Sequence, residues 1–92
     1  FECLIIDDGS TDDTGAVARR LAERDSRIQV HTQPNGGGAA ARAYGLSLAR
    51  GEYVAYLDHD DRWAEDKLAL QVEMLDRNPE FGLVYGRVSL YN

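Results

Sequence analysis

Short apolar runs alternate along this chain with longer segments in which apolar residues recur every three or four positions. Residues 2–6, 28–31 and 53–57 are the short runs, rich in Ile, Val, Leu and Tyr, and each predicts a β-strand. Residues 81–91 form another extended segment, which predicts a last strand or two. The periodic segments between the runs predict helices.

Three helices are expected. The first begins within Ser10–Thr14, which is rich in N-cap residues, and ends near Asp25. The second covers roughly residues 39–49. The third follows the apolar stripe from Leu68 to Leu75, and Asn78-Pro79 ends it, because the residue before a proline disfavours helix.

Strands and helices therefore alternate in the order β-α-β-α-β-α-β. This order is typical of an α/β fold in which crossover helices cover a largely parallel sheet. In such sheets ligands bind in the crevice outside the carboxyl ends of the strands. Residues that directly follow the predicted strands are thus the first candidates for function.

Two acidic segments occupy such positions. Asp7-Asp8 follows the first predicted strand, and Asp58-His59-Asp60-Asp61 follows the third. Neither segment contains Lys or Arg, so the carboxylates repel one another unless a cation or ligand donors relieve the repulsion. The pattern indicates a site for a divalent metal and a nucleotide.

The first acidic segment also has a structural explanation. Gly9 permits a tight turn, and the polar residues after it can cap a helix, with Asp12 and Asp13 favouring the helix dipole. This explanation leaves two adjacent carboxylates at the strand end. Because neighbouring residues point in different directions, one of Asp7 and Asp8 can face a ligand and the other the turn. Both remain candidate nucleotide-binding residues.

The second acidic segment has an Asp-x-Asp core. Alternate residues of an extended segment face the same side, so Asp58 and Asp60 can converge on a metal such as Mg²⁺ or Mn²⁺, which prefer hard oxygen ligands. We expect Asp61 to cap the next helix instead. A helix-flanked calcium loop is excluded, because Trp63 and Ala69 occupy the positions that need Gly and Glu.

A glycine-rich segment, Asn35–Gly38, precedes the second helix and is followed one turn later by Arg42. Its composition is typical of a phosphate-binding loop, but its spacing matches neither the dinucleotide fingerprint nor the P-loop. A flexible loop before a helix is the favoured interpretation. Trp63 is expected to be a half-buried aromatic at the rim of the site, with an acceptor platform as the alternative.

Composition narrows the class of protein. The chain has 92 residues and a formal net charge of −6, so we expect one small domain that binds no nucleic acid, since a phosphate-backbone binder needs a basic face. The single cysteine, Cys3, lies in an apolar run and predicts a buried structural thiol. Without a disulfide framework the expected location is the cytoplasm or the cytoplasmic face of a membrane.

Three motifs in order and spacing resemble glycosyltransferase family 2, an inverting family with the GT-A fold. The first is Ile5–Thr14, which reads Ile-Ile-Asp-Asp-Gly-Ser-Thr-Asp-Asp-Thr. The second runs from Asn35-Gly36-Gly37 to Arg42, where the family's usual next residue, Asn, is replaced by Ala43. The third is Ala-Arg-Gly-Glu-Tyr over residues 49–53, a strand, and Asp58-His59-Asp60-Asp61.

The resemblance implies a three-layer α/β/α Rossmann-like GT-A fold. It implies hexosyl transfer from a UDP- or GDP-linked sugar to a saccharide or lipid-linked acceptor, with inversion and with Mg²⁺ or Mn²⁺. By position, Asp8 with its neighbour Asp7 would contact the nucleoside, Asp60 would hold the metal, and Asp58 would serve the metal and the ribose side. The catalytic base of the family lies further along the sequence, so we expect it beyond Asn92.

Residues 1–92 would then form a partial nucleotide-sugar-binding domain that lacks the family's first strand and its acceptor region. Such a piece is expected to be inactive alone, and its unpaired strand edges predict homo-oligomers. The alternative function is a non-catalytic α/β module that binds a nucleotide or a metal.

Overall fold

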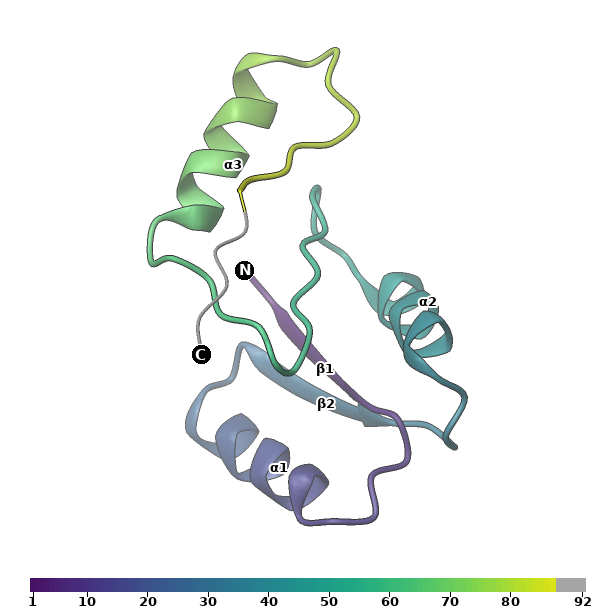
Figure 1. The fold of residues 1–92 in the computed structure, drawn as a ribbon. Helices are drawn as coiled ribbons and strands as arrows, with labels where there is room; N and C mark the ends of the chain where they lie inside the picture. The colour runs from purple at the N-terminus through teal and green to yellow at the C-terminus, as the bar shows by residue number, and fades with distance from the viewer. Residues whose placement is uncertain (88–92) are drawn as a thin grey trace. The chain divides into compact units, whose positions relative to one another are not determined.

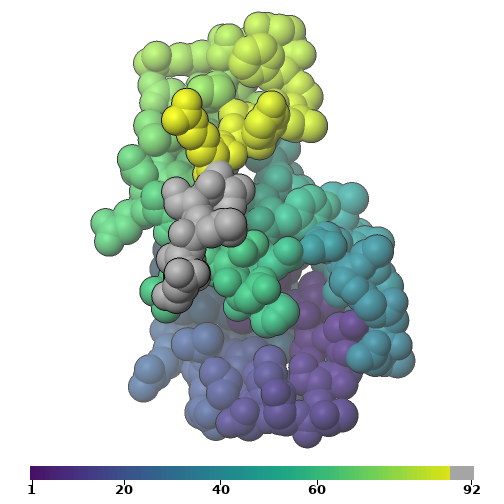
Figure 2. Space-filling model, in the orientation of Figure 1, coloured from purple at the N-terminus to yellow at the C-terminus, as the bar shows by residue number. Residues whose placement is uncertain are grey.

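A computed structural model describes residues 1–87 and divides the chain into two compact units, residues 1–56 and residues from 57 onward. The first unit contains β1 (Cys3–Asp7), α1 (Thr14–Arg24), β2 (Ile28–Thr32) and α2 (Gly38–Leu48). The second contains α3 (Lys67–Arg77). Figure 1 shows the five elements, and the same colour scale identifies the two units in the space-filling view of Figure 2.

β1 and β2 form a two-stranded parallel sheet, as the first two predicted strands require. Cys3 pairs with Ile28 and Asp7 with Thr32, so both strands reach the same edge of the sheet together. α1 is the crossover between them, because parallel neighbours cannot be joined by a tight turn. The carboxyl ends of both strands therefore present their following residues, Asp8 and Gln33, side by side.

The helices α1 and α2 lie on opposite faces of this sheet (Figure 1). Gly15 of α1 approaches the side chain of Asp7, whereas Gly45 of α2 approaches Ile6. Successive residues of a strand point to opposite faces, so contacts to Asp7 and Ile6 place the two helices on different sides. The first unit thus has the predicted helix–sheet–helix layering around two strands.

The predicted strand at Tyr53–Leu57 is not formed, which corrects the β-α-β-α-β-α-β order. Within the described residues the chain reads β-α-β-α-α. A strand requires a neighbour to hydrogen-bond with, and no strand of the described residues pairs with this run. Its side chains remain largely exposed, among them Val54 and Tyr56. The segment after α3 is likewise not a strand up to residue 87, and the rest of that prediction, residues 88–91, lies outside the described residues.

The helix boundaries agree with the periodicity to within a few residues. α1 ends at Arg24, and the loop after it is held by Arg27, whose guanidinium lies 2.7 Å from Asp25 and over the ring of Phe1. Arg27 lowers the pKa of Asp25 to about 2, chiefly through its side-chain hydrogen bonds. Glu2 binds the segment after α2, because its carboxylate accepts from the Arg50 backbone N–H at 2.7 Å.

The buried core of the described residues is small. Ala18 of α1, at 5% exposure, is the one buried hydrophobic residue among them, and Cys3 is half-buried with a free thiol rather than fully buried as predicted. None of the helices described in residues 1–87 is long and apolar enough to span a membrane.

Candidate nucleotide- and metal-binding site

Asp7 faces inward and organises the turn from β1 to α1. The residue is only 6% exposed, and its Oδ1 accepts a hydrogen bond from the Ser10 backbone N–H at 3.0 Å. A Cβ on Gly15 would lie 2.7 Å from Asp7 Oδ2, so the first turn of α1 packs directly on the carboxylate. Asp12 Oδ1 accepts from the Thr14 N–H at 3.0 Å, so its side chain bonds the start of α1. Asp13 is the N-cap residue and neither aspartate lies in the first turn of the helix, so the first-turn position expected for them is wrong.

Asp8 points the other way, as the alternation of the strand predicts. Its Oδ1 accepts hydrogen bonds from Gln33 Nε2 at 2.7 Å and from the Gly36 backbone N–H at 2.8 Å. Its Oδ2 accepts from the Gly37 N–H at 2.9 Å. We call Asp8, Gln33, Gly36 and Gly37 the Asp8 clasp, because their hydrogen bonds connect the end of β1 to the loop between β2 and α2.

The clasp holds the pKa of Asp8 below its ordinary value. The hydrogen bond from Gln33 is the largest cause, followed by that from Gly36; partial burial opposes them, and Gly37 contributes a smaller lowering. Hydrogen bonds donated to the charged form of an acid favour that form. Asp8 is therefore an ionised acceptor at neutral pH.

Two glycines shape the clasp. Gly9 has φ of +72°, in the left-handed region, and a Cβ there would lie 2.7 Å from the Asn35 backbone nitrogen. Gly37 has φ of +93° and is the N-cap residue of α2, with its carbonyl accepting from the Ala41 N–H. The turn after β1 can approach Asn35 this closely only because Gly9 has no side chain, and both positive φ angles favour glycine.

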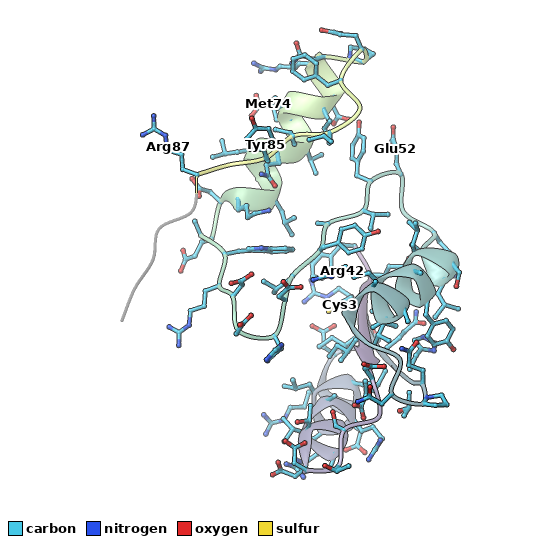
Figure 3. All side chains as sticks on the ribbon, turned by 45° about the vertical axis from the view of Figure 1, so that its right-hand side comes forward. Cys3, Arg42, Glu52, Met74, Tyr85 and Arg87 are labelled. Atoms are coloured by element: carbon cyan, nitrogen blue, oxygen red, sulfur yellow. The ribbon has the colours of Figure 1, made fainter. Side chains whose placement is uncertain are left out.

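This geometry decides what the glycine-rich loop does in the structure. The N–H groups of Gly36 and Gly37, which a phosphate-binding loop would offer to a ligand, donate to Asp8. Three hydrogen bonds, donated by Gln33, Gly36 and Gly37, therefore hold the loop to Asp8. Its composition predicts a flexible loop instead. Arg42, labelled in Figure 3, lies one turn into α2, with its Nη1 3.5 Å from the Cβ position of Gly38.

In the second unit three carboxylates gather in one place. Oxygens of Asp58, Asp60 and Asp61 all lie within 4.8 Å of one another, and the three residues are exposed. A turn brings them together: the Asp61 N–H donates to the Asp58 carbonyl at 3.1 Å. The expected convergence of Asp58 and Asp60 is present, although a turn and not an extended strand produces it.

The prediction that Asp61 caps the third helix is wrong. α3 begins at Lys67, and its N-cap residue is Asp66. The turn at residues 58–61 instead returns Asp61 toward Asp58. Sequence reasoning could have included Asp61 in the carboxylate group, because four consecutive polar residues are typical of a turn. His59, between them, is exposed.

Trp63 is half-buried, as predicted. Lys67 Nζ lies 4.3 Å from the centre of its ring, a cation–π arrangement, and the same ammonium donates to Gln71 Oε1 at 2.7 Å. Both contacts tie the segment after the acidic turn to the first turns of α3.

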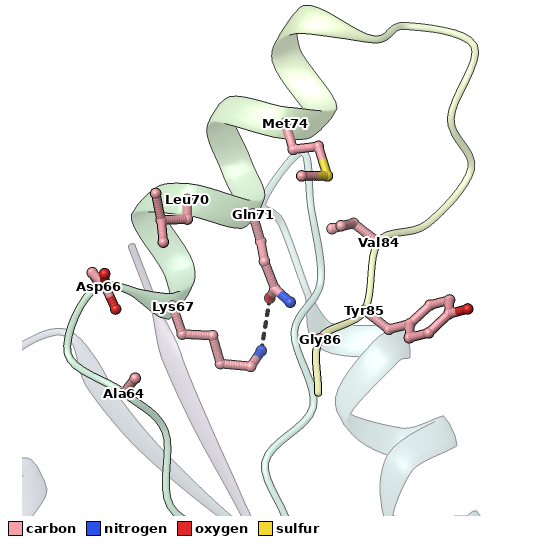
Figure 4. A pocket seen from close by; sticks show the side chains of 9 residues that line it. All are labelled: Ala64, Asp66, Lys67, Leu70, Gln71, Met74, Val84, Tyr85 and Gly86. Atoms are coloured by element: carbon pink, nitrogen blue, oxygen red, sulfur yellow. Dashed lines mark hydrogen bonds between the residues drawn. The ribbon is translucent and has the colours of Figure 1, made fainter. Parts of the chain in front are cut away.

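A shallow apolar pocket of about 260 Å³ lies between α3 and the segment at Val84–Gly86 (Figure 4). Leu70, Met74 and Tyr85 are among its lining residues, and the three carboxylates are not. Its ionisable lining residues are Asp66, Lys67 and Tyr85, and Lys67 is already bonded to Gln71. The acidic turn and the Asp8 clasp therefore remain the stronger candidates for chemistry.

Residues 1–91 match the sequence model of a known family, described as "Glycosyl transferase family 2". The chain belongs to glycosyl transferase family 2. The resemblance drawn from the three motifs is thereby confirmed, and the match spans both the clasp and the acidic turn.

Curated relatives agree with the family. The chain is 43% identical over 83 residues to the putative teichuronic acid biosynthesis glycosyltransferase TuaG of Bacillus subtilis, covering 88% of this chain and 33% of the relative. It is 39% identical over 89 residues to the glycosyltransferase GlyG of Streptococcus pneumoniae, covering 92% and 30%. An uncharacterized glycosyltransferase of Rickettsia felis is 44% identical over 78 residues, covering 85% and 13%.

The chain thus spans between about an eighth and a third of the length of these relatives. No solved structure matches it.

Proposed function

We propose that this chain supplies the donor-binding part of a glycosyltransferase. The protein would transfer a sugar from a nucleotide-diphosphate-sugar to an acceptor hydroxyl with inversion. Membership of glycosyl transferase family 2 supports the reaction class. The main support for a donor-binding site is the convergence of Asp58, Asp60 and Asp61, whose oxygens lie within 4.8 Å of one another.

The acidic turn fits a divalent cation by its donor set. Three exposed carboxylates provide hard oxygen ligands, which Mg²⁺ and Mn²⁺ prefer, and like charges this close favour a bound cation. We assign Asp60 and Asp58 as the metal ligands, with Asp58 also facing the ribose. A bound cation would neutralise negative charge on the nucleoside diphosphate that leaves the sugar.

The nucleoside is assigned to the edge of the sheet at Asp8, with Asp7 behind it. Among the described residues three donors reach the Asp8 carboxylate, two on Oδ1 and one on Oδ2. A carboxylate has about four acceptor positions, so one remains on Oδ2 for an N–H or O–H group of a ligand. Asp7 has the different role of holding the turn, since it is buried and bonded to Ser10.

Turnover of the donor tests this function without knowledge of the acceptor. The full-length protein is incubated with UDP- and GDP-sugars and Mn²⁺, with and without a chelator, and release of the nucleoside diphosphate is measured. We expect release from one donor class, lost on chelation. Binding of the nucleotide without any turnover, even with saccharide acceptors, would favour a non-catalytic binding module. Neither binding nor turnover would contradict the proposal.

A further inference from the structure

Gln33 stands immediately after β2, where its backbone and its side chain both reach the end of β1. Its backbone N–H donates to the Asp7 carbonyl at 2.9 Å, which extends the ladder between β1 and β2 by one bond. Its side-chain amide donates to Asp8 Oδ1 at 2.7 Å. An ionised carboxylate only accepts, so the nitrogen of the amide must face it.

The bond from Gln33 differs from the other two in the clasp. Gly36 and Gly37 donate through the backbone, so their direction follows from the loop, whereas Gln33 is the one side chain among the described residues that fixes the carboxylate. Gly36 and Gln33 share Oδ1, and Gly37 takes Oδ2. Together they set the plane of the carboxylate and, counting the donors of residues 1–87, leave one acceptor position on Oδ2.

We infer that Gln33 is a positioning residue for nucleotide recognition: it orients the Asp8 carboxylate so that its one remaining acceptor position faces the nucleotide. The inference rests on the proposed function, since it takes Asp8 as a ligand of the donor. Gln33 acts through Asp8 and does not itself contact the nucleotide. Without the N–H of the Gln33 amide, the Asp8 carboxylate can rotate about its Cβ–Cγ bond. Its oxygens would then accept from Gly36 and Gly37 in a different arrangement.

The first test is Gln33→Leu in the full-length enzyme, which removes the donor and keeps much of the volume. We expect the donor KM to rise about tenfold, the factor that corresponds to 1.4 kcal/mol, with kcat changed less than about twofold. A substitution that weakens binding of the ground state and of the transition state equally raises KM and leaves kcat unchanged. Gln71→Leu is the matched control, because Gln71 is also half-buried and bonded through its amide, to Lys67.

The second test is Gln33→Glu, which keeps the size and shape of the side chain. At pH 8 two carboxylates would face each other and repel, so the donor KM should rise at least as much as in Gln33→Leu. At pH 5.5 the pair shares a proton, the introduced carboxyl group can donate to Asp8, and the defect relative to wild type at the same pH should shrink. A loss that reflected only structural damage would not recover in acid.

These results separate the inference from the function beneath it. A wild-type enzyme that neither binds nor consumes any nucleotide-sugar contradicts the proposed function. A wild-type enzyme that does, with a donor KM unchanged in Gln33→Leu, overturns the role of Gln33 alone. Equal falls of kcat in Gln33→Leu and Gln71→Leu would also overturn it. If Gln33→Leu fails to fold, as its melting temperature would reveal, the pH dependence of Gln33→Glu decides.

Discussion

In the first unit the carboxylates at the carboxyl end of β1 accept hydrogen bonds from nearby N–H groups, and in the second unit three carboxylates lie close together. Asp7 takes the N–H of Ser10, and Asp8 takes three donors from the loop before α2. Asp58, Asp60 and Asp61 instead lie exposed within 4.8 Å of one another. The two acidic segments look alike in sequence, but only the second brings three carboxylates within 4.8 Å of one another.

The difference supports the separate roles proposed for the two segments. Fixed N–H groups hold a carboxylate in one orientation, so its acceptor positions have a defined direction. Such a group suits recognition of a neutral base or a sugar hydroxyl. Carboxylates clustered together create a local negative potential that suits a cation. A nucleotide-diphosphate donor needs both kinds of site, one for its nucleoside and one for its diphosphate.

The largest effect is expected from removing the proposed metal ligand. Asp60→Ala in the full-length enzyme should lower kcat/KM for the donor by about a hundredfold or more, as loss of one preorganised electrostatic partner does in other enzymes. Donor turnover at varied Mn²⁺ concentration measures it. Asp66→Ala is the control, because Asp66 lies in the same unit and its side chain makes no cap hydrogen bond to α3. Equal activity of both variants would remove Asp60 from the metal site.

A smaller effect, on stability, is expected in the first unit. Gly9→Ala should destabilise the fold by more than about 2 kcal/mol, since a left-handed φ alone costs about 1–2 kcal/mol and the new Cβ would also collide with Asn35. Gly37→Ala meets no neighbour, since nothing lies within 4 Å of its Cβ position, but its φ of +93° with ψ of 167° is a conformation almost confined to glycine, so it should also be destabilising. Chemical denaturation of the wild type and the two variants measures the difference.

Gly82→Ala serves as the neutral reference, with open space around its Cβ position, and should change stability by no more than about 0.5 kcal/mol. If Gly9→Ala is no worse than Gly82→Ala, the left-handed turn after β1 and its close approach to Asn35 are not present in solution.

The smallest effect concerns Asp25, outside both acidic segments. Arg27 lowers its pKa to about 2, so this group stabilises the folded state above its ordinary unfolded pKa of about 4. That contribution is lost as the pH falls from about 4 through about 2. Carboxyl NMR titration should give a midpoint near 2 in the wild type and a higher one in Arg27→Gln. A wild-type midpoint near the ordinary value of about 4 would show that the ion pair is not formed in solution.

The elements of the first unit could be predicted from sequence because each is specified locally. The β-branched run before Asp7, the cap-rich turn before Thr14 and the Ala-rich stretch after Gly37 all agree with the elements they form. Tyr53–Leu57 fails for the opposite reason. Its residues have high strand propensity, but a strand exists only with a partner, and partners are set by the rest of the fold.

The site was partly predictable. The opposite directions of Asp7 and Asp8 follow from the two-residue period of a strand. The partners of Asp8 do not, because Gln33, Gly36 and Gly37 reach it only through the parallel pairing of β1 with β2. Similarly, Asp61 joins Asp58 through a turn whose geometry the Asp-x-Asp spacing does not contain.

Calorimetric titration of UDP and GDP into the full-length protein, with Mn²⁺ and with a chelator, tests the central claim most directly. If one acidic segment holds the nucleoside and the other the metal, one of the two nucleotides binds with Mn²⁺ and its affinity falls sharply on chelation. Binding that is equally tight with and without metal, or no binding of either nucleotide, would contradict the division of labour between Asp8 and Asp60.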